Sequence, residues 1–197
     1  MTHGSKLSGR FDQALIYATL IHAGQTRKAT GIPYIGHLLG VASIALEYGA
    51  DEDEAIGALL HDAAEDVGGS GRLQDIRVRF GEKVAHTVEG CTDTLETPKP
   101  PWRERKEKYV AHLSSADPST LLVSAADKLY NTRAILHNLR QDGDDVWTRF
   151  AGRKEGSLWY YRALVNGFRQ HREHNRELVD ELDRTVSEIE KLAGVSG

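Results

Sequence analysis

The feature that most constrains this chain is an apolar helical run that turns abruptly polar. Residues 55–60 read AIGALL, and residues 61–66 read HDAAED. A helix that buries Ile56, Leu59 and Leu60 on its apolar side gains no stability from ending in four ionisable groups. The fold must therefore place this polar face against something other than the apolar core.

The four ionisable groups share one face of that helix. At about 100° per residue, an arc of about 140° contains them all: His61, Asp62, Glu65 and Asp66. Three clustered carboxylates raise one another's pKa unless positive charge lies among them, and a divalent cation supplies that charge. The alternative is an exposed acidic face, but the flanking AIGALL and the two alanines within the motif favour burial.

The rest of the chain is helical in pattern, and no alternating run of β-branched residues predicts a strand. GGSG at 68–71 predicts a break, and loops are expected at 94–101 and 141–153. Helices are expected at about 14–21, 38–49, 51–67, 73–80, 82–92, 102–115, 118–140, 156–175 and 176–193. We therefore predict an all-α helical bundle with residues 38–48 and 55–66 at its core and a metal site at its centre.

The chain has 197 residues, of which 40% are hydrophobic, enough for one compact domain with a good core. We expect a single domain over 1–197, with a core at about 10–175 and a C-terminal helix at 176–197. The polar and apolar pattern of that last helix offers a packing face or a homo-oligomer contact.

Several classes of protein are disfavoured. The chain shows no signal-peptide pattern and no apolar run near the roughly 18 residues that span a bilayer. Cys91 is the only cysteine, so no intrachain disulfide is expected, and we predict a cytoplasmic protein without a membrane partner. The net charge of −4 argues against nucleic-acid binding. KPPWRERKEK at 99–108 has five positive and two negative residues; it is either a solvated helix start or a rim that attracts an anionic small molecule.

A metal site needs ligands beyond His61 and Asp62, and two other segments offer candidates. His37 begins a buried helix, where a capping or packing role is the alternative. Asp127 interrupts the apolar run LLVSAA, where the alternative is an ion pair with Lys128 or an arginine. Two histidines and two carboxylates suit Mn, Fe or Zn better than calcium. A helical bundle can bring three such helices together at its centre.

The H…HD…D pattern resembles that of the HD-domain metal-dependent phosphohydrolases. Four segments narrow the resemblance: HAGQTRKATGIPYIGHLLGVA (22–42), ALLHDAAED (58–66), RFGEKVA (79–85) and AADKLYNTR (125–133). Together they resemble the hydrolase domain of RelA/SpoT-type alarmone enzymes, and particularly the small stand-alone alarmone hydrolases. The resemblance covers about residues 10–175, and no synthetase region is expected within this length.

The resemblance implies a role for each matching side chain. It implies one metal, typically Mn²⁺, held by His37, His61, Asp62 and Asp127. It implies a water-activating pair made by Glu65 and Asp66. It implies substrate contacts by Arg27, Lys28, Asn131 and, in the late helix, Tyr160 or its neighbour Tyr161. One departure concerns the phosphate contacts, because Ala29 stands where long family members often have a serine.

The implied activity is hydrolysis of the 3′-diphosphate of guanosine or adenosine tetra- or pentaphosphate. The products are pyrophosphate and GDP or GTP, or their adenosine counterparts, so the partner is a small nucleotide. Two alternatives stay open: a phosphatase for another nucleotide such as NADPH, and a non-catalytic nucleotide sensor. The intact Glu65–Asp66 pair speaks against the sensor, which needs no water-activating group.

Overall fold

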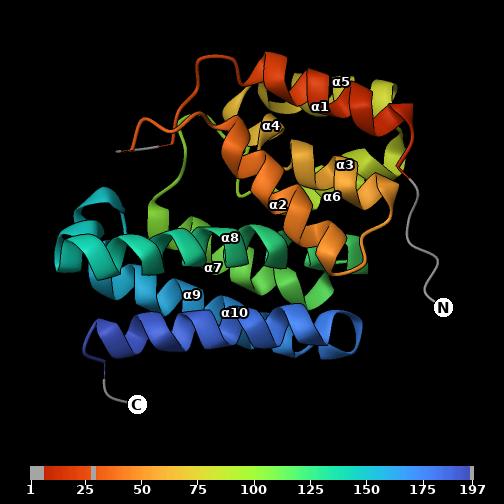
Figure 1. Ribbon diagram of the computed structural model, residues 1–197. Coiled ribbons are helices and arrows are strands. Elements are labelled where there is room, and N and C mark those ends of the chain that lie inside the picture. Colours follow the sequence, from red (N-terminus) through yellow and green to blue (C-terminus); the bar gives the residue numbers. More distant parts are fainter. Residues whose placement is uncertain (1–6, 28–29, 196–197) are drawn as a thin grey trace.

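The computed structural model describes residues 7–27 and 30–195, with the backbone alone for 172–174. Its described residues form helices and no strand, apart from one isolated antiparallel bridge between Thr26 and Pro33 (Figure 1). The predicted all-α class is therefore confirmed. No helix in this part of the chain is both long enough and apolar enough to cross a membrane.

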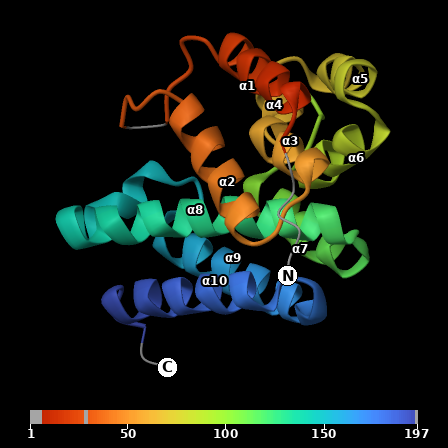
Figure 2. The same cartoon turned by 45° about the vertical axis from the view of Figure 1, so that its right-hand side comes forward.

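The N-terminal helices form the upper part of the molecule in Figure 1. They are α1 (Gly9–Ile21), α2 (Ile35–Glu47), α3 (Glu52–Leu60), α4 (Ala63–Asp66), α5 (Gly69–Phe80) and α6 (Glu82–Cys91). Helix α2 contacts both α3 and α8, and the turned view shows α5 and α6 on the far side of α3 from α2 (Figure 2). This arrangement makes α2 and α3 the central helices, as the sequence predicts.

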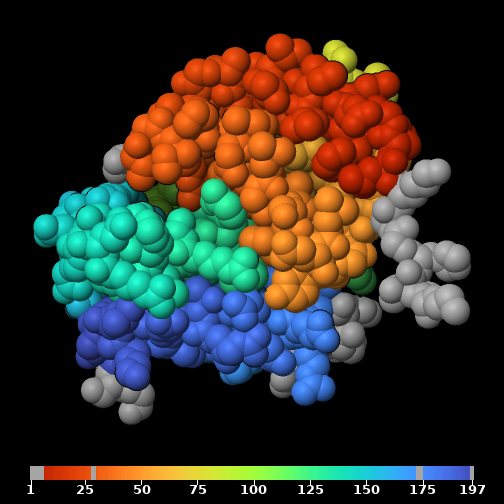
Figure 3. Space-filling view, in the orientation of Figure 1, coloured from red at the N-terminus to blue at the C-terminus, as the bar shows by residue number. Residues whose placement is uncertain are grey.

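The second half of the chain forms the lower part. It consists of α7 (Trp102–His112), η1 (Leu113–Ser115), α8 (Pro118–Asp142), η2 (Gly143–Arg149), α9 (Arg153–Arg169) and α10 (Arg172–Leu192). Helix α10 packs along α8 and α9, and in the space-filling view it forms the lower edge beneath α8 (Figure 3). Helix α8 is thus the element shared by the two halves.

Two helices begin at strong side-chain caps. Asp51 accepts from the backbone N of Glu54 at 2.9 Å, and Glu54 accepts in return from the backbone N of Asp51 at 2.8 Å, which is a capping box at α3. Asp117 accepts from the backbone N of Ser119 at 3.0 Å, ahead of Pro118 at the first turn of α8. The caps fix where α3 and α8 start, and hence how far along each helix its site residues lie.

The buried core has two parts. The larger part joins α1–α10 through the fully buried apolar faces of α2, α3 and the first half of α8. A smaller core closes the far end, where the end of α8 meets η2 and α10 through Ile135, Leu136, Leu139, Val146, Trp147, Ile189 and Ala193. The polar residues of the candidate site lie within the first part.

Several predicted boundaries before the last two helices differ from the structure. The helix expected over 51–67 is divided at His61 and Asp62, where α3 ends and α4 begins. The GGSG segment interrupts the helical structure only at Gly68, whose φ is +113°, because α5 already starts at Gly69. Most of the loop expected at 141–153 is the short 3-10 helix η2. Composition alone does not reveal where such short helical segments begin and end.

The C-terminal helices also differ in their bounds. The backbone leaves helical angles at Asn175 (φ −142°, ψ 39°), so the predicted start at 176 coincides with a kink inside α10 rather than with its first residue. The helix predicted over 176–193 ends at Leu192, within one residue of the expected end, because Gly194 takes a φ of +77°, a conformation that favours glycine and terminates helices.

Candidate active site

Three buried side chains from three helices meet at the centre of the molecule. His37 comes from the first turn of α2, His61 follows the end of α3, and Asp127 lies midway along α8. One ligand atom of each lies within 4.8 Å of the others. The Nε2 atoms of His37 and His61 lie 3.4 Å and 3.6 Å from Oδ1 of Asp127. All three are at least 94% buried, so the cluster belongs to the interior.

Asp62 completes the group from its more exposed side. Its Oδ2 lies 3.0 Å from Nε2 of His61 and 3.4 Å from Nε2 of His37. The same oxygen accepts a hydrogen bond of 2.5 Å from the hydroxyl of Tyr34. The side chain of Asp62 is 23% exposed, so one side of the cluster is accessible. The structure thus brings together the four side chains that the sequence singles out as ligands.

The imidazole of His61 is oriented as a ligand would be. Its Nδ1 lies 2.9 Å from the carbonyl of Ala58, and since a carbonyl only accepts, Nδ1 carries the proton. Its buried Nε2 points at two carboxylates without a hydrogen-bond partner. Histidines that bind metals are typically held in this way by their second nitrogen. The donor set of imidazole and carboxylate fits a divalent transition metal.

The cluster keeps both of its carboxylates charged in the interior. Burial lowers the pKa of His61, but Asp62 and Asp127 outweigh burial and hold this pKa well above its ordinary value. Burial alone dominates at His37, where the pKa is lowered. Burial raises the pKa of Asp127, but Lys128 and the two imidazoles lower it further. Two carboxylates therefore stay charged in the interior, which favours a cation between them.

The sequence leaves open whether Asp127 is a metal ligand or an ion-pair partner of Lys128, and its two oxygens allow both. Its Oδ2 accepts from Nζ of Lys128 at 2.5 Å, so the ion pair is real. Its Oδ1 faces the two imidazoles and also accepts from Nδ2 of Asn131 at 2.5 Å. One oxygen is thus neutralised within α8, and the other is directed into the cluster.

Glu65 and Asp66 lie one turn beyond Asp62, and other segments hold each of them. Glu65 accepts from Nζ of Lys99 at 2.8 Å and from the backbone N of Asp93 at 3.2 Å. Asp66 accepts from Nε2 of Gln25 at 2.8 Å. Burial and the charge of Asp62 raise the pKa of Asp66. Both carboxylates are therefore fixed rather than free to turn with α4.

The predicted substrate residues on the two sides of the cluster are connected. The guanidinium of Arg27 donates to Oδ1 of Asn131 at 2.7 Å, and Asn131 in turn bonds to Asp127. The same guanidinium lies 6.0 Å from the ring centre of Tyr34 and 5.9 Å from that of Tyr130. Lys28, the neighbouring predicted contact, lies outside the described residues.

Tyr160, the predicted substrate contact on α9, packs against residues of α7. It is 6% exposed, its ring packs against Trp102 at 6.2 Å, and Nζ of Lys106 lies 5.0 Å from its centre. Tyr161 is less buried, and its pKa is raised to about 12 by burial. A substrate contact by Tyr160 stays a prediction, with Tyr161 as its neighbour on α9.

The basic segment at 99–108 lies beside the site, with most of its charge paired. Lys99 bonds to Glu65, while Arg105 and Lys106 both bond to Asp93. Burial and the nearby Lys128 lower the pKa of Lys106 to about 8. The segment therefore contacts the site through Lys99, which holds Glu65, while most of its positive charge is already paired.

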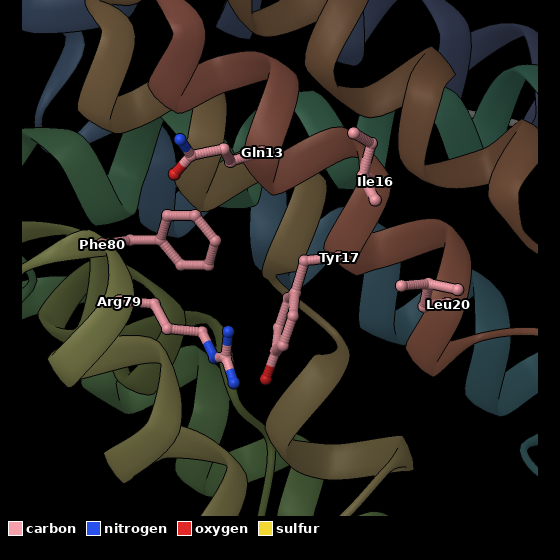
Figure 4. A pocket seen from close by; sticks show the side chains of 6 residues that line it. All are labelled: Gln13, Ile16, Tyr17, Leu20, Arg79 and Phe80. Carbon is pink, nitrogen blue, oxygen red and sulfur yellow. The ribbon is translucent and has the colours of Figure 1, made fainter.

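A surface hollow lies apart from this cluster, between α1 and α5. It has a volume of about 370 Å³ and is lined by Gln13, Ile16, Tyr17, Leu20, Arg79 and Phe80 (Figure 4). No carboxylate or imidazole lines it, so it offers none of the ligands of the central cluster.

Sequence reasoning missed several side chains that contact the site. They are His22, Gln25, Tyr34 and Lys99. The first three lie in the segment 22–42, whose motif was matched as a whole. Their polar type within that segment was the available signal, but their partners lie tens of residues away in the chain.

Comparison with known families finds one match by sequence model. The model of the HD domain matches residues 14–156. The guanosine-3′,5′-bis(diphosphate) 3′-pyrophosphohydrolase MESH1 of Xenopus tropicalis is 39% identical over 126 residues, which cover 62% of this chain and 68% of that protein. The GTP pyrophosphokinase rsh of Brucella ovis is 31% identical over 210 residues, 93% of this chain. The chain spans only 28% of the Brucella protein, and 14% of a relative from Mycobacterium leprae.

Comparison with solved structures agrees. A structure described as a metazoan ortholog of SpoT that hydrolyzes ppGpp and plays a role in starvation responses superposes with a TM-score of 0.76. The two chains are 26% identical, and the match covers 98% of this chain and 99% of the other. The shared architecture therefore extends from the central cluster to the C-terminal helices.

Proposed function

The chain belongs to the HD domain family, and from that membership we propose that it is a metal-dependent pyrophosphohydrolase. Its proposed substrates are (p)ppGpp and related alarmones such as (p)ppApp, from which it removes the 3′-diphosphate. The observation that carries this proposal is the buried cluster of His37, His61, Asp62 and Asp127 with two fixed carboxylates one helical turn away. Relatives named for this activity support the choice of substrate.

The proposed cofactor is one divalent ion, Mn²⁺, held by the four clustered side chains. The two imidazoles and two carboxylates suit this ion, and Nε2 of His61 is directed to receive it. When bound, such an ion polarises a phosphoryl oxygen and makes a nucleophilic water available near neutral pH.

The proposed chemistry is a single displacement at phosphorus. The oxygen of water bonds to the phosphorus attached to O3′, and the bond between that phosphorus and O3′ breaks. One of the pair Glu65 and Asp66 takes the proton of the water. The other donates a proton to O3′ as it leaves. Both carboxylates lie within one turn of Asp62, and their hydrogen bonds to Lys99 and Gln25 hold them there.

The proposed substrate contacts lie on the Arg27 side of the cluster. Arg27 and Lys28 would pack on the base and reach the phosphates, while Asn131 contacts the nucleoside. The stacked position of Arg27 near Tyr34 and Tyr130 supports this role, because a planar guanidinium can stack on a base as well as bind phosphate. Tyr160 is proposed as a further contact from α9. We also propose that the enzyme works in the cytoplasm.

A substrate panel tests the proposal. The purified protein is incubated with Mn²⁺ and ppGpp, pppGpp, ppApp or NADPH, and pyrophosphate and orthophosphate are measured separately. The proposal requires pyrophosphate from at least one of the alarmones. Orthophosphate from NADPH without turnover of any alarmone would contradict it and favour a nucleotide phosphatase. Binding of ppGpp without any product would favour a nucleotide sensor.

A further inference from the structure

Three side chains to which the proposed reaction assigns no role connect two carboxylates of the candidate site. We call them the support: His22, Gln25 and Tyr34. His22 is 4% exposed and directly follows α1, whereas Gln25 and Tyr34 lie half-buried in the segment between α1 and α2. Each contacts another member of the support or a site carboxylate.

The backbone fixes how the three lie. The backbone N of Tyr34 donates to the carbonyl of Gln25 at 2.9 Å, and the backbone N of Gln25 donates to the carbonyl of His22 at 3.0 Å. A further bond of 2.8 Å runs from the N of Arg27 to the carbonyl of Ile32. These bonds place Gln25 and Tyr34 side by side, next to Asp66 and Asp62 of the candidate site.

One arm of the support reaches Asp62. The hydroxyl of Tyr34 donates to Oδ2 at 2.5 Å, the same oxygen that faces the two imidazoles of the cluster. The ring of His22 stacks on that of Tyr34, with the centres 5.3 Å apart and the planes 25° from parallel. The stack restrains the phenol ring, and the phenol in turn fixes the direction of one carboxylate oxygen.

The other arm reaches Asp66. Because a carboxylate only accepts, the amide nitrogen of Gln25 must be the atom that faces Asp66, at 2.8 Å. The amide oxygen of Gln25 then faces Nδ1 of His22 at 2.7 Å, and since that oxygen also only accepts, Nδ1 is the donor. The direction of every hydrogen bond in this arm is therefore determined.

We propose that the support positions two carboxylates of the site, the cation ligand Asp62 and the catalytic Asp66. His22 holds both of the side chains that contact them. Tyr34 orients Asp62 toward the bound ion, and Gln25 orients Asp66 toward the reacting water. This assignment rests on the proposed function for the role of Asp66. The arm to Asp62 concerns cation binding alone and is tested without a nucleotide.

The first experiment removes one hydroxyl. Tyr34→Phe keeps the ring and its stack but removes the bond to Asp62. The matched control is Tyr17→Phe, because the hydroxyl of Tyr17 bonds to Asp75 at 2.6 Å outside the candidate site. Titration of metal-free protein with Mn²⁺ should show a Kd raised about 10- to 100-fold in Tyr34→Phe, with the control close to the wild type. A Kd of Tyr34→Phe equal to that of the wild type, with both proteins folded by circular dichroism, overturns the proposal.

The second experiment separates the two arms. His22→Phe keeps an aromatic ring against Tyr34 but removes the donor to Gln25. At saturating Mn²⁺ we expect kcat for ppGpp to fall roughly 10-fold, the equivalent of one lost hydrogen bond, with KM and the Kd for Mn²⁺ unchanged. An unchanged kcat contradicts the arm to Asp66. If wild-type protein binds Mn²⁺ but cleaves none of the alarmones, the proposed function fails, while the Tyr34→Phe result still decides the arm to Asp62.

Discussion

Two clusters of charge in this molecule are built in opposite ways. The central cluster joins His37, His61, Asp62 and Asp127 in the interior, with Nε2 of His61 left without a hydrogen-bond partner. The outer cluster lies between α9 and α10, where Arg162 donates to Asp183 at 2.6 Å and to Glu190 at 2.9 Å. Its side chains are 20–29% exposed, and cations and carboxylates alternate.

The difference indicates what each cluster is for. In the outer cluster the carboxylates satisfy the guanidinium, and they raise its pKa further, so this cluster is complete without a ligand. In the central cluster Lys128 neutralises one oxygen of Asp127, and the remaining carboxylate oxygens face imidazoles. Because the buried Nε2 of His61 also has no hydrogen-bond partner there, the central cluster, unlike the outer one, is arranged to accept a cation.

The largest expected effect comes from removing the central charge. Asp127→Asn keeps the shape of the side chain but removes the carboxylate that faces both imidazoles. We expect affinity for Mn²⁺ to fall by at least about 100-fold and hydrolysis of ppGpp to fall with it, because loss of even an indirect partner of a ligand costs 10–100-fold. Asp183→Asn in the outer cluster is the control and should bind Mn²⁺ like the wild type. Unchanged Mn²⁺ binding by Asp127→Asn would refute the assignment of Asp127.

The next effect separates catalysis from metal binding within the site. Glu65→Gln should lower kcat by about 10²- to 10⁴-fold, the range expected for a lost general base, while Mn²⁺ still binds. Isothermal titration with Mn²⁺ and steady-state kinetics on the same preparation measure both. Glu190→Gln in the outer cluster should leave kcat unchanged. Full activity in Glu65→Gln would move the water-activating role to Asp66.

A third prediction concerns stability when the metal is removed. A cation that binds only the folded chain stabilises it by about 2.7 kcal/mol at a free concentration one hundred times its Kd. Adding Mn²⁺ to chelator-treated protein should therefore raise the melting temperature, and Asp127→Asn should not respond. An equal rise in both proteins would place the stabilising ion elsewhere.

A smaller effect is expected at the cap of α8, the helix that carries Asp127. Asp117→Ala should destabilise the fold by about 1 kcal/mol, because the cap bonds to Ser119 and Thr120 are lost. Burial raises the pKa of Asp117, but those bonds lower it further, so the net pKa is depressed. A depressed pKa means that the stabilisation is present above the unfolded-state pKa of about 3.9 and is lost as the pH falls through the folded-state value.

Urea unfolding of wild type and Asp117→Ala at a series of pH values measures this effect. The difference in unfolding free energy between the two proteins should be full at neutral pH and shrink below about pH 4. A difference that is constant across this range would show that the ionised cap contributes nothing.

The smallest effect is expected in the outer cluster. Arg162→Met should cost at most about 1 kcal/mol of unfolding free energy, because partly exposed ion pairs contribute little. Hydrolysis and Mn²⁺ affinity should be unchanged. A loss of Mn²⁺ affinity in this variant would contradict the separation of the two clusters.

Two segments of the central cluster stand out in the sequence because their charges interrupt apolar runs, and the resemblance to the HD-domain hydrolases implies the full ligand set with His37. HDAAED after AIGALL and Asp127 within LLVSAADK could not be explained by packing, and all four ligand candidates converge in the structure. The helical class follows from the same periodic pattern. A local sequence pattern therefore predicts the helices and the unusual charges on each of them, because both depend on residues within a single helix.

The supporting contacts could not be predicted because their partners are far apart in the chain. Tyr34 reads as a core aromatic ahead of His37, yet its hydroxyl bonds to Asp62, 28 residues away. Lys99 reads as part of a solvated basic segment, yet it holds Glu65 across 34 residues. The backbone bonds that position Gln25 and Tyr34 are likewise invisible to composition, so only the folded chain reveals them.

The most direct test of the account is to measure metal content and ppGpp hydrolysis together in one titration. Chelator-treated wild-type protein is titrated with Mn²⁺, and bound metal and released pyrophosphate are determined at each point. The account predicts one bound ion per chain and pyrophosphate release that rises in proportion to it, with neither in Asp127→Asn. Full hydrolysis of ppGpp by metal-free protein, or by Asp127→Asn, would contradict the central claim.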